Sequence, residues 1–283
     1  MRRLKNWCLT EQPRFVTHGP RSRNLEKRIR LKQTKEIKNQ PLEKITRLNS
    51  LLEAVKHSPE RVNRILILEG AKRPKIAELI LWARRNHIPF SFLPAKRLRI
   101  IEKGHQGAVG FLTAKEYSTL DSILASKGIP FLVLLDGIED PQNLGAIIRT
   151  AEGAGVDGIL IPERRAATLT GAVVSVSAGA VEHMKVARVK NLARAMEELK
   201  KKGLWLVGAE GGQSDPWYDF DYALPVGLVF GSESKGLRRL VREKCDKILS
   251  IPLFGKITSL NVAAAAAVFM YEVVRQRKNT RHE

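Results

Sequence analysis

Six short apolar runs alternate with segments of helical periodicity between residues 130 and 276. The runs are PFLVLLD, VDGILIP, HMKVARV, LWLVGAE, PVGLVFG and CDKILSIP. Strands that are apolar almost throughout are typical of a sheet that is covered on both faces. Helices between successive strands indicate that most of the strands are parallel. We therefore predict an α/β domain over residues 130–276, with helices on both faces of a mostly parallel sheet.

A second, smaller α/β pattern precedes this domain over residues 47–112. Strand-like VNRILILEG, IPFSFLP and HQGAVGFL alternate there with helix-like RLNSLLEAVKH, PKIAELILWARRNH and AKRLRIIEK. A chain of 283 residues is long enough for two such cores. Residues 113–129 are expected to form a linker with a helical turn or two. Residues 1–46 form a basic N-terminal extension, and residues 277–283 a basic tail.

The charge of the chain indicates a polyanionic partner. The formal net charge is +20, and residues 1–47 alone hold 14 Lys and Arg against 4 Glu. Such an excess favours binding to nucleic acid, because lysine and arginine displace the counterions around phosphates. The extension is either a disordered, solvated tail or an arm that binds RNA or DNA. Charge alone does not identify the nucleic acid.

Several classes of protein are excluded by the pattern of apolar and cysteine residues. No run reaches the roughly 18 apolar residues of a membrane-spanning helix. The basic start MRRLKNWCLTEQPRF is not followed by the apolar segment of a secretory signal. Cys8 and Cys245 are far apart and belong to no zinc or disulfide pattern. We expect a cytoplasmic protein without a membrane partner and without a bound metal.

The first motif with chemical potential is LLDGIEDPQNLGAIIRTAEGAG, residues 134–155. It places Asn143 and Arg149 after a strand, and ligands of open parallel sheets bind outside the carboxyl ends of the strands. The two residues are six apart, so they do not share one face if both are helical. They converge only if Asn143 lies in the loop before the helix and Arg149 points inward. The alternative makes Asn143 a helix cap and Arg149 a surface cation.

The second motif is VGLVFGSESKGL, residues 226–237. A strand ends at Gly231, where the missing side chain allows a ligand to approach the backbone closely. Glu233 follows in the loop. The pattern is neither G-x-G-x-x-G nor a phosphate-binding P-loop, so it does not identify a nucleotide site. Ser234 has the alternative role of a cap for the next helix.

The third motif is IPLFGKITSLNVAAAAAVFMYEV, residues 251–273. Ser259 and Asn261 precede a run of five alanines with high helix propensity. Ser259 is a candidate N-cap of that helix. The alanines leave a surface without bulk, on which another backbone or helix packs closely. This is a structural reason for the alanines, independent of catalysis.

Together, in this order and spacing, the three motifs resemble those of the SpoU-type (TrmH-like) RNA ribose 2'-O-methyltransferases of the SPOUT superfamily. The signals are N-L-G-x-x-x-R-T-A, F-G-S-E-x-x-G-L and I-P-x-x-G-x-x-x-S-L-N-V. The resemblance covers residues 130–276 and, through KGHQGAVGFL, extends to the small domain. Within the family it is greatest to enzymes that methylate a guanosine of 23S rRNA. The alternatives are a tRNA methyltransferase, an adenosine-specific enzyme of the thiostrepton-resistance type, and a non-catalytic RNA-binding ribosome-assembly protein.

The resemblance implies S-adenosylmethionine as cofactor, a trefoil knot in the large domain, a homodimer, and a small domain that binds RNA like a ribosomal protein. It implies catalytic roles for five polar residues: Asn143, Arg149, Glu233, Ser259 and Asn261. It also implies that the backbone binds the cofactor at Gly231, Ile251 and Leu260. Methyl transfer from a sulfonium to a ribose hydroxyl needs no metal, in agreement with the expectation above.

Overall fold

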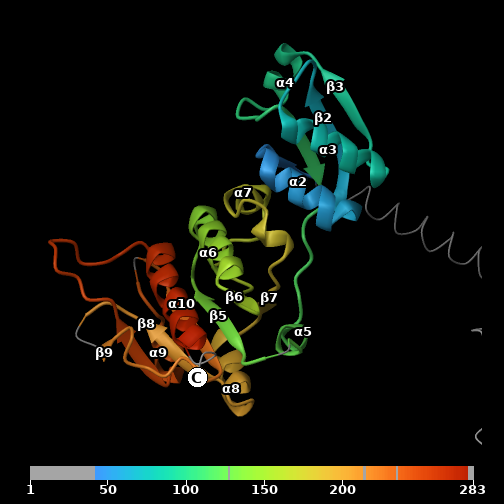
Figure 1. The fold of residues 1–283 in the computed structure, drawn as a ribbon. Coiled ribbons are helices and arrows are strands. Elements are labelled where there is room, and N and C mark those ends of the chain that lie inside the picture. Colours follow the sequence, from blue (N-terminus) through green and yellow to red (C-terminus); the bar gives the residue numbers. More distant parts are fainter. Residues whose placement is uncertain (1–41, 127, 213–214, 234, 280–283) are drawn as a thin grey trace, which may run out of the picture. The chain divides into compact units, whose positions relative to one another are not determined.

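A computed structural model describes residues 42–126, 128–212, 215–233 and 235–279 (Figure 1). The expectations for the extension before residue 42, for Cys8 and for Ser234 lie outside these residues. Among the helices that the structure describes, none is both long and apolar enough to cross a membrane.

A seven-stranded sheet forms the centre of the large domain, in the order β7-β6-β5-β10-β8-β11-β9. Every neighbouring pair is parallel. The strands are β5 (Phe131–Asp136), β6 (Gly158–Pro162), β7 (Val186–Val189), β8 (Trp205–Ala209), β9 (Asp215–Pro216), β10 (Val226–Gly231) and β11 (Lys247–Ser250). All six apolar runs form strands of this sheet, which confirms the predicted parallel α/β class. The two-residue β9 is too short to give a sequence pattern.

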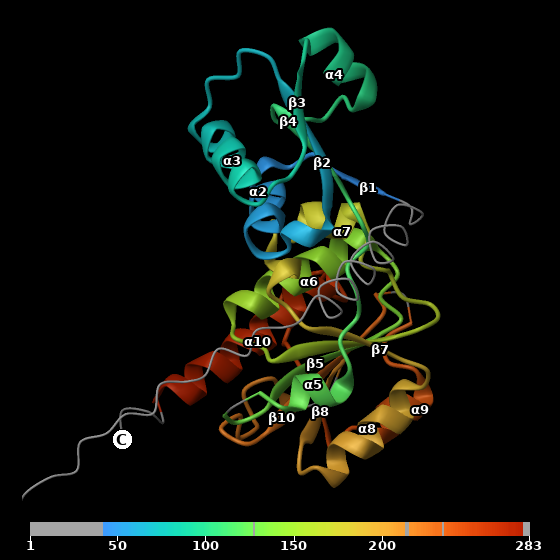
Figure 2. The same ribbon diagram turned by 90° about the vertical axis from the view of Figure 1, so that its right-hand side faces the viewer.

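Helices cover both faces of this sheet, as Figure 2 shows for α6 and α10 on one side and α8 and α9 on the other. The helical elements are α5 (Leu120–Leu124), α6 (Pro141–Gly153), α7 (Gly171–Val176), η2 (Ala180–Glu182), α8 (Leu192–Lys201), α9 (Arg239–Lys244) and α10 (Val262–Asn279). Along β5, Val133 and Leu135 belong to the cluster under α6 and α10. Leu132 and Leu134 alternate with them and belong to the cluster under α8 and α9. This alternation explains why the strand is apolar at every position.

The small domain contains a four-stranded sheet in the order β1-β4-β2-β3. Its elements are β1 (Glu43–Ile45), α2 (Leu48–His57), η1 (Pro59–Arg61), β2 (Val62–Leu68), α3 (Pro74–Arg85), β3 (Phe90–Leu93), α4 (Ala95–Ile101) and β4 (Ala108–Leu112). Strand β1 pairs antiparallel with β4, so the sheet begins at Glu43, before the boundary expected at residue 47. A three-residue strand carries too little periodicity to be recognised in the sequence.

Helix α10 continues to Asn279, so its last residues lie in the segment that was expected to be a basic tail. Arg277 anchors this end of the helix through its guanidinium. It donates hydrogen bonds to four backbone carbonyls, those of Ile129, Pro130, Tyr222 and Leu224. The basic residues at the end of α10 therefore include one with a structural role.

A buried ion pair joins the small domain to the large one. Arg61 Nη1 donates to both carboxylate oxygens of Glu182, at 2.8 and 2.7 Å. The Glu182 side chain is fully buried, and Ser58 Oγ donates to the same carboxylate at 2.8 Å. Arg61 also donates to the Thr113 carbonyl through Nε and Nη2. These contacts satisfy the buried charge of Glu182, and loss of its cationic partner would be strongly destabilising.

We predict that Arg61→Met lowers the free energy of unfolding by about 3 kcal/mol, because it leaves the Glu182 carboxylate buried without its cation. Urea denaturation followed by circular dichroism measures this change. Arg194→Met is the matched control, since Arg194 pairs with Glu198 on the surface, with exposed fractions of 79% and 50%. The control is expected to change the free energy of unfolding by less than about 0.5 kcal/mol. Similar changes in the two variants contradict the prediction.

Candidate active site

Three segments that are distant in the sequence meet at the carboxyl edge of the large sheet. Asn143 lies in the first turn of α6, after β5, and Glu233 follows β10. Asn261 immediately precedes α10. Strands β5 and β10 are parallel neighbours whose last residues, Asp136 and Gly231, are paired in register. The loops after these strands therefore leave the sheet at the same place, as ligand-binding loops of such sheets do.

The Glu233 carboxylate is the acceptor that unites these three segments. Its Oε1 accepts hydrogen bonds from Asn143 Nδ2 at 3.1 Å, from Asn261 Nδ2 at 2.6 Å and from the Val262 backbone nitrogen at 3.3 Å. Asn261 Nδ2 also donates to Asn143 Oδ1 at 2.8 Å. Hydrogen bonds to a charged acceptor are stronger than neutral ones, so they fix an otherwise exposed carboxylate. The structure thus brings together one predicted polar residue from each of the three motifs.

Asn261 caps helix α10. Its Oδ1 accepts hydrogen bonds from the backbone nitrogens of Ala263 at 2.9 Å and Ala264 at 3.3 Å. The expectation that Ser259 is the N-cap is wrong, because the helix begins only at Val262. An asparagine side chain holds both an acceptor and a donor. It therefore caps α10 through one atom and binds Glu233 through the other.

Asn143 is not the cap of helix α6. The N-cap is Asp140, whose Oδ1 accepts a hydrogen bond from the Gln142 backbone nitrogen at 2.9 Å. The Asn143 side chain bonds instead to the carboxylate after β10. The alternative in which Asn143 is merely a helix cap is therefore excluded.

A tight turn after β10 presents Glu233. A Cβ atom at Gly231 would lie only 2.2 Å from the carbonyl carbon of Gly236, so this position accepts no side chain. Behind the turn, the fully buried Asp136 carboxylate accepts hydrogen bonds from the Arg238 backbone nitrogen at 2.9 Å and Nε at 2.6 Å. Both ends of the turn are thus fixed, which limits the positions open to the carboxylate between them.

Two adjacent hollows share this turn. The first has glycine and apolar walls, lined by residues that include Phe230, Gly231, Ile251, Leu253, Leu260 and Phe269, with Glu210 and Ser259 as polar members. The second is rich in charged groups, among them Asp136, Glu139, Asp140, Arg165, Lys235 and Arg238. Both hollows are lined by Ser232, Glu233 and Val262. Glu233 therefore lies at the border between an apolar site and a polar one.

Arg149 lies apart from this constellation. It follows Asn143 by six residues on the same helix, which displaces it by about 9 Å along the axis and by roughly 120° around it. It is exposed and lines a different hollow, together with Glu53 of α2 and His183. The convergence of Asn143 and Arg149 that the sequence left open does not occur within one copy of the chain.

Sequence reasoning missed Glu210, which lines the apolar hollow. Glu210 belongs to the segment GAEGGQ, which lies outside the three motifs. Glu210 directly follows β8, which is a parallel neighbour of β10, and ligands bind at the carboxyl ends of such strands. This position was the signal in the sequence. Arg242 Nε donates to Glu210 Oε2 at 2.7 Å and so orients the carboxylate. This hydrogen bond raises the pKa of Arg242 above its usual value.

Comparison with known proteins explains this arrangement. The sequence profile of the SpoU rRNA Methylase family matches residues 130–271, and that of RNA 2'-O ribose methyltransferase substrate binding matches residues 48–118. YacO of Bacillus subtilis, named as a TrmH family tRNA/rRNA methyltransferase, is 41% identical over 234 residues, covering 81% of this chain and 94% of YacO. The chain belongs to the SpoU rRNA methylase family. It is therefore an RNA methyltransferase, which confirms the resemblance drawn from the three motifs.

Further relatives support the same family assignment. A TrmH family tRNA/rRNA methyltransferase of Staphylococcus saprophyticus is 40% identical over 225 residues, covering 78% of this chain and 90% of the relative. Among solved structures, the SpoU methyltransferase AviRb of Streptomyces viridochromogenes, in complex with the cofactor AdoMet, has a TM-score of 0.71 and 26% identity. That similarity covers 83% of this chain and 90% of AviRb.

We predict that Asn261→Ala lowers the free energy of unfolding by about 1 kcal/mol through loss of the α10 cap. Asn261→Ser keeps a capping oxygen and is expected to remain within about 0.5 kcal/mol of the parent. Both variants lose the amide that binds Glu233, so both are expected to methylate RNA about 100-fold more slowly. Urea denaturation and methyl transfer to RNA measure the two effects. Equal losses of stability in the two variants would contradict the capping role.

Proposed function

We propose that this SpoU-family enzyme transfers the methyl group of S-adenosylmethionine to the 2'-hydroxyl of a ribose in RNA, and that the target is a guanosine of 23S rRNA. The observation that carries the proposal is the position of Glu233, which borders both an apolar hollow and a charged one. A methyltransferase needs such a border, because the methyl donor and the acceptor must meet there.

The first hollow fits S-adenosylmethionine, which supplies a methyl group activated by a sulfonium. The apolar walls of the hollow suit the adenine ring and the carbons attached to the sulfonium. Backbone groups at Gly231, Ile251 and Leu260 are available for the adenine and the amino-acid end, as the family resemblance implies. The carboxylate of Glu210 adds an acceptor for a hydroxyl or ammonium group of the cofactor. Binding of AdoMet by the related AviRb supports the same ligand here.

The second hollow fits the RNA backbone. Arg165 and Lys235 are exposed and line it, together with Arg238, which is bound to Asp136. The carboxylates of Glu139, Asp140 and Glu233 also line this hollow. Guanidinium and ammonium groups bind phosphate and position a nucleic acid without reading its sequence. Asn143 and Asn261 carry neutral hydrogen-bonding amides beside this hollow, suited to a ribose.

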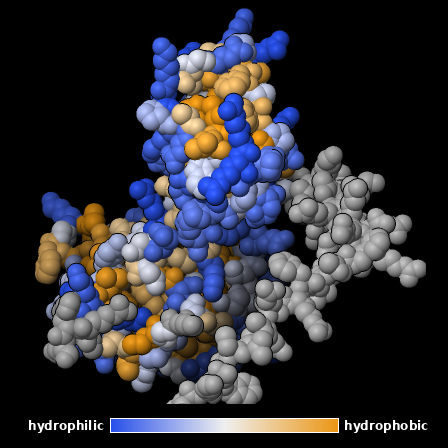
Figure 3. Space-filling model, turned by 45° about the vertical axis from the view of Figure 1, so that its right-hand side comes forward, coloured by the Kyte–Doolittle hydropathy of each residue, from blue (hydrophilic) through white to orange (hydrophobic). Residues whose placement is uncertain are grey.

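The small domain offers a second surface for RNA. Its helix α4 exposes Lys96, Arg97 and Arg99, and the apolar side chains of Ile100 and Phe92 are 78% and 48% exposed. The upper part of Figure 3 shows apolar patches bordered by hydrophilic residues on this domain. Cations bind RNA phosphates, and exposed aromatic rings stack on unpaired bases. The match to a substrate-binding profile supports this role.

The reaction is a single displacement in which the ribose oxygen attacks the methyl carbon, the carbon–sulfur bond breaks, S-adenosylhomocysteine leaves as a neutral thioether, and the hydroxyl proton passes to solvent. The hydroxyl is a poor nucleophile, so the enzyme must hold its oxygen about 3 Å from the methyl group and assist the loss of its proton. Glu233, held by Asn143 and Asn261, fixes the geometry around this oxygen, and Ser259 adds a hydroxyl. Arginine stays protonated in proteins and is a poor base. We assign Arg149 the role of lowering the hydroxyl's pKa electrostatically or of orienting the adjacent phosphate.

A homodimer supplies that arginine. Within one copy, Arg149 lines another hollow and not the one beside Glu233. A twofold dimer that brings α6 of one copy to the site of the other would let Arg149 of the partner subunit complete it. Helix α10, which packs beside α6, exposes Tyr271 by 52%, and this exposed apolar ring supports an interface on these helices.

We predict that Arg149→Ala abolishes methylation while leaving cofactor affinity within about twofold, because Arg149 lies away from the apolar hollow. Transfer of a radioactive methyl group to RNA measures the first effect, and calorimetry with S-adenosylmethionine the second. Near-normal turnover by the variant would exclude Arg149 from the site.

Mixing two inactive variants tests whether the arginine acts across the dimer. Arg149→Ala and Glu233→Gln are refolded together in equal amounts, with each variant refolded alone as the control. If Arg149 acts in the partner's site, half of the dimers contain one intact site and activity recovers to about one quarter of the parent. If it acts in its own chain, no dimer contains an intact site and the mixture stays inactive.

The target is tested by mapping 2'-O-methyl groups in total RNA from cells with and without the gene. We expect one guanosine of 23S rRNA to lose its methyl group. Loss from tRNA, or from an adenosine of rRNA, would assign the enzyme to another branch of the family. A 2'-deoxy nucleotide at the target is expected to block methylation, since the acceptor oxygen is then missing. Methylation of that substrate would show that the methyl group goes to a base and not to the ribose.

A further inference from the structure

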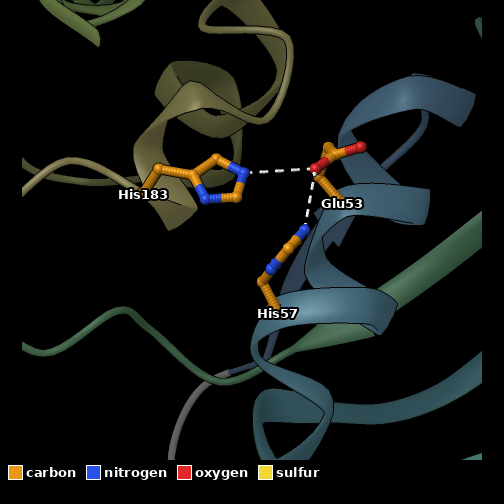
Figure 4. Close-up of side chains that lie close together, drawn as sticks. All are labelled: Glu53, His57 and His183. Carbon is orange, nitrogen blue, oxygen red and sulfur yellow. Dashed lines mark hydrogen bonds and ion pairs between the residues drawn. The ribbon is translucent and has the colours of Figure 1, made fainter. Parts of the chain in front are cut away.

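Outside the active site, Glu53, His57 and His183 form a group that we call the His–Glu cluster (Figure 4). Glu53 and His57 lie one turn apart on α2, and His183 directly follows η2. Figure 4 shows one ring nitrogen of each histidine directed at the same oxygen of the Glu53 carboxylate. The proposed methyl transfer uses none of these three residues.

The distances within the cluster match those between the ligands of one tetrahedral metal ion. His183 Nε2 lies 3.2 Å and His57 Nε2 3.4 Å from Glu53 Oε2. The potential ligand atoms of the three residues all lie within 4.8 Å of one another. A tetrahedral zinc ion with bonds near 2.0–2.1 Å separates its ligand atoms by about 3.3 Å. The two nitrogen–oxygen distances in the cluster are therefore close to the ligand–ligand distance of a tetrahedral zinc site.

The chemistry of the donors also favours a metal. Two imidazoles and one carboxylate form a zinc ligand set with an open fourth position, as in several zinc sites. The ring centroids of His57 and His183 are 4.3 Å apart, and one nitrogen of each ring approaches the same Glu53 oxygen, so one ion could contact all three residues. A cation between the three groups satisfies all of them.

The fold holds the cluster in place. At Gly179, where φ is +95°, a Cβ atom would lie 2.7 Å from Glu53 Cβ, so α2 packs directly against this turn. His183 follows Glu182, whose buried carboxylate is bound by Arg61 and Ser58. Both ends of the cluster are thus fixed before any ion binds, which reduces the entropy that binding must offset.

The surroundings leave the cluster accessible to ions. The side chains of Glu53, His183 and His57 are 31%, 37% and 48% exposed. Lys56 and Lys75 line the same hollow as the cluster and have partners of their own. Lys56 pairs with Glu78 at 2.7 Å, and Lys75 donates to Asn49 Oδ1 at 2.6 Å. Arg149 and Glu152 line the same hollow and carry opposite charges, so no single sign dominates it.

We propose that the His–Glu cluster binds one zinc ion, which joins α2 of the small domain to the segment after η2 in the large domain. The ion links the two segments, with water in its fourth position, and takes no part in the proposed methyl transfer, which needs no metal. Its bonds strengthen the contact that the Arg61–Glu182 pair also forms. The proposal is independent of the methylation target and departs from the sequence-based expectation that the chain carries no metal.

Zinc titration of the full chain tests the proposal. The protein is first stripped with a chelator, then titrated with zinc chloride by calorimetry and in competition with a chromophoric chelator. One ion per chain is expected, and His57→Ala and His183→Ala are each expected to weaken its binding by more than about tenfold. His87→Asn is the control, because His87 lies outside the cluster and asparagine tolerates its φ of 56°. This variant is expected to bind zinc like the parent.

Two readouts keep the test decisive even where a variant folds poorly. X-ray absorption of the zinc-loaded parent is expected to show two histidine ligands and no sulfur. Zinc is also expected to raise the midpoint of thermal unfolding of the parent and of His87→Asn, but not that of folded cluster variants. Failure of the parent to bind zinc at about 100 μM, sulfur among the ligands, or unchanged binding by both folded cluster variants would each overturn the proposal.

Discussion

The Glu233 carboxylate holds the candidate active site of this enzyme together. One oxygen of this group accepts from Asn143 after β5, from Asn261 before α10 and from the first backbone nitrogen of that helix. A single exposed hydrogen bond contributes little, but several donors at one charged acceptor restrict its motion strongly. The starts of α6 and α10 are therefore connected through a side chain that belongs to neither helix.

This connection gives a chemical reason for asparagine at position 261. Aspartate also caps helices but has no donor for Glu233, and serine would have to cap and donate through one short hydroxyl, whereas the amide of asparagine carries acceptor and donor on two separate atoms. The alanines that follow have a separate cause. Ala266 is fully buried, and Phe269 one turn later packs edge-to-face on Phe230 of β10, with ring centroids 5.8 Å apart. Small residues let the helix approach the sheet, and the larger ring fills the space beyond.

The sequence was sufficient to predict what depends on long apolar runs. The strands of the parallel sheet were recognised because each is buried on both faces, whereas β1 and β9 were missed because three and two residues carry no periodicity. Apolar periodicity does not predict contacts between side chains that are distant in the sequence. Motif spacing grouped Asn143, Glu233 and Asn261 only through a family resemblance. The cap of α10 was misassigned by two residues, since both Ser259 and Asn261 are good caps and only the backbone decides between them. His57 and His183 are 126 residues apart, so no spacing rule connects them.

Two residues of the first motif, Asn143 and Arg149, lie on helix α6 but point to different sites. Its N-terminal turn presents Asn143 to Glu233, while Arg149 leaves the helix from another side. The helix must therefore keep a fixed orientation, because any rotation would displace both groups together. Gly145 provides for this: a Cβ there would lie 2.6 Å from Val176 Cβ, so α7 packs against the backbone of α6 itself. The His–Glu cluster connects α2 with His183, which follows η2, and its residues Glu53 and His183 line the same hollow as Arg149. In the proposed dimer, a rigid contact at this place would help to hold Arg149 in position for the partner's site.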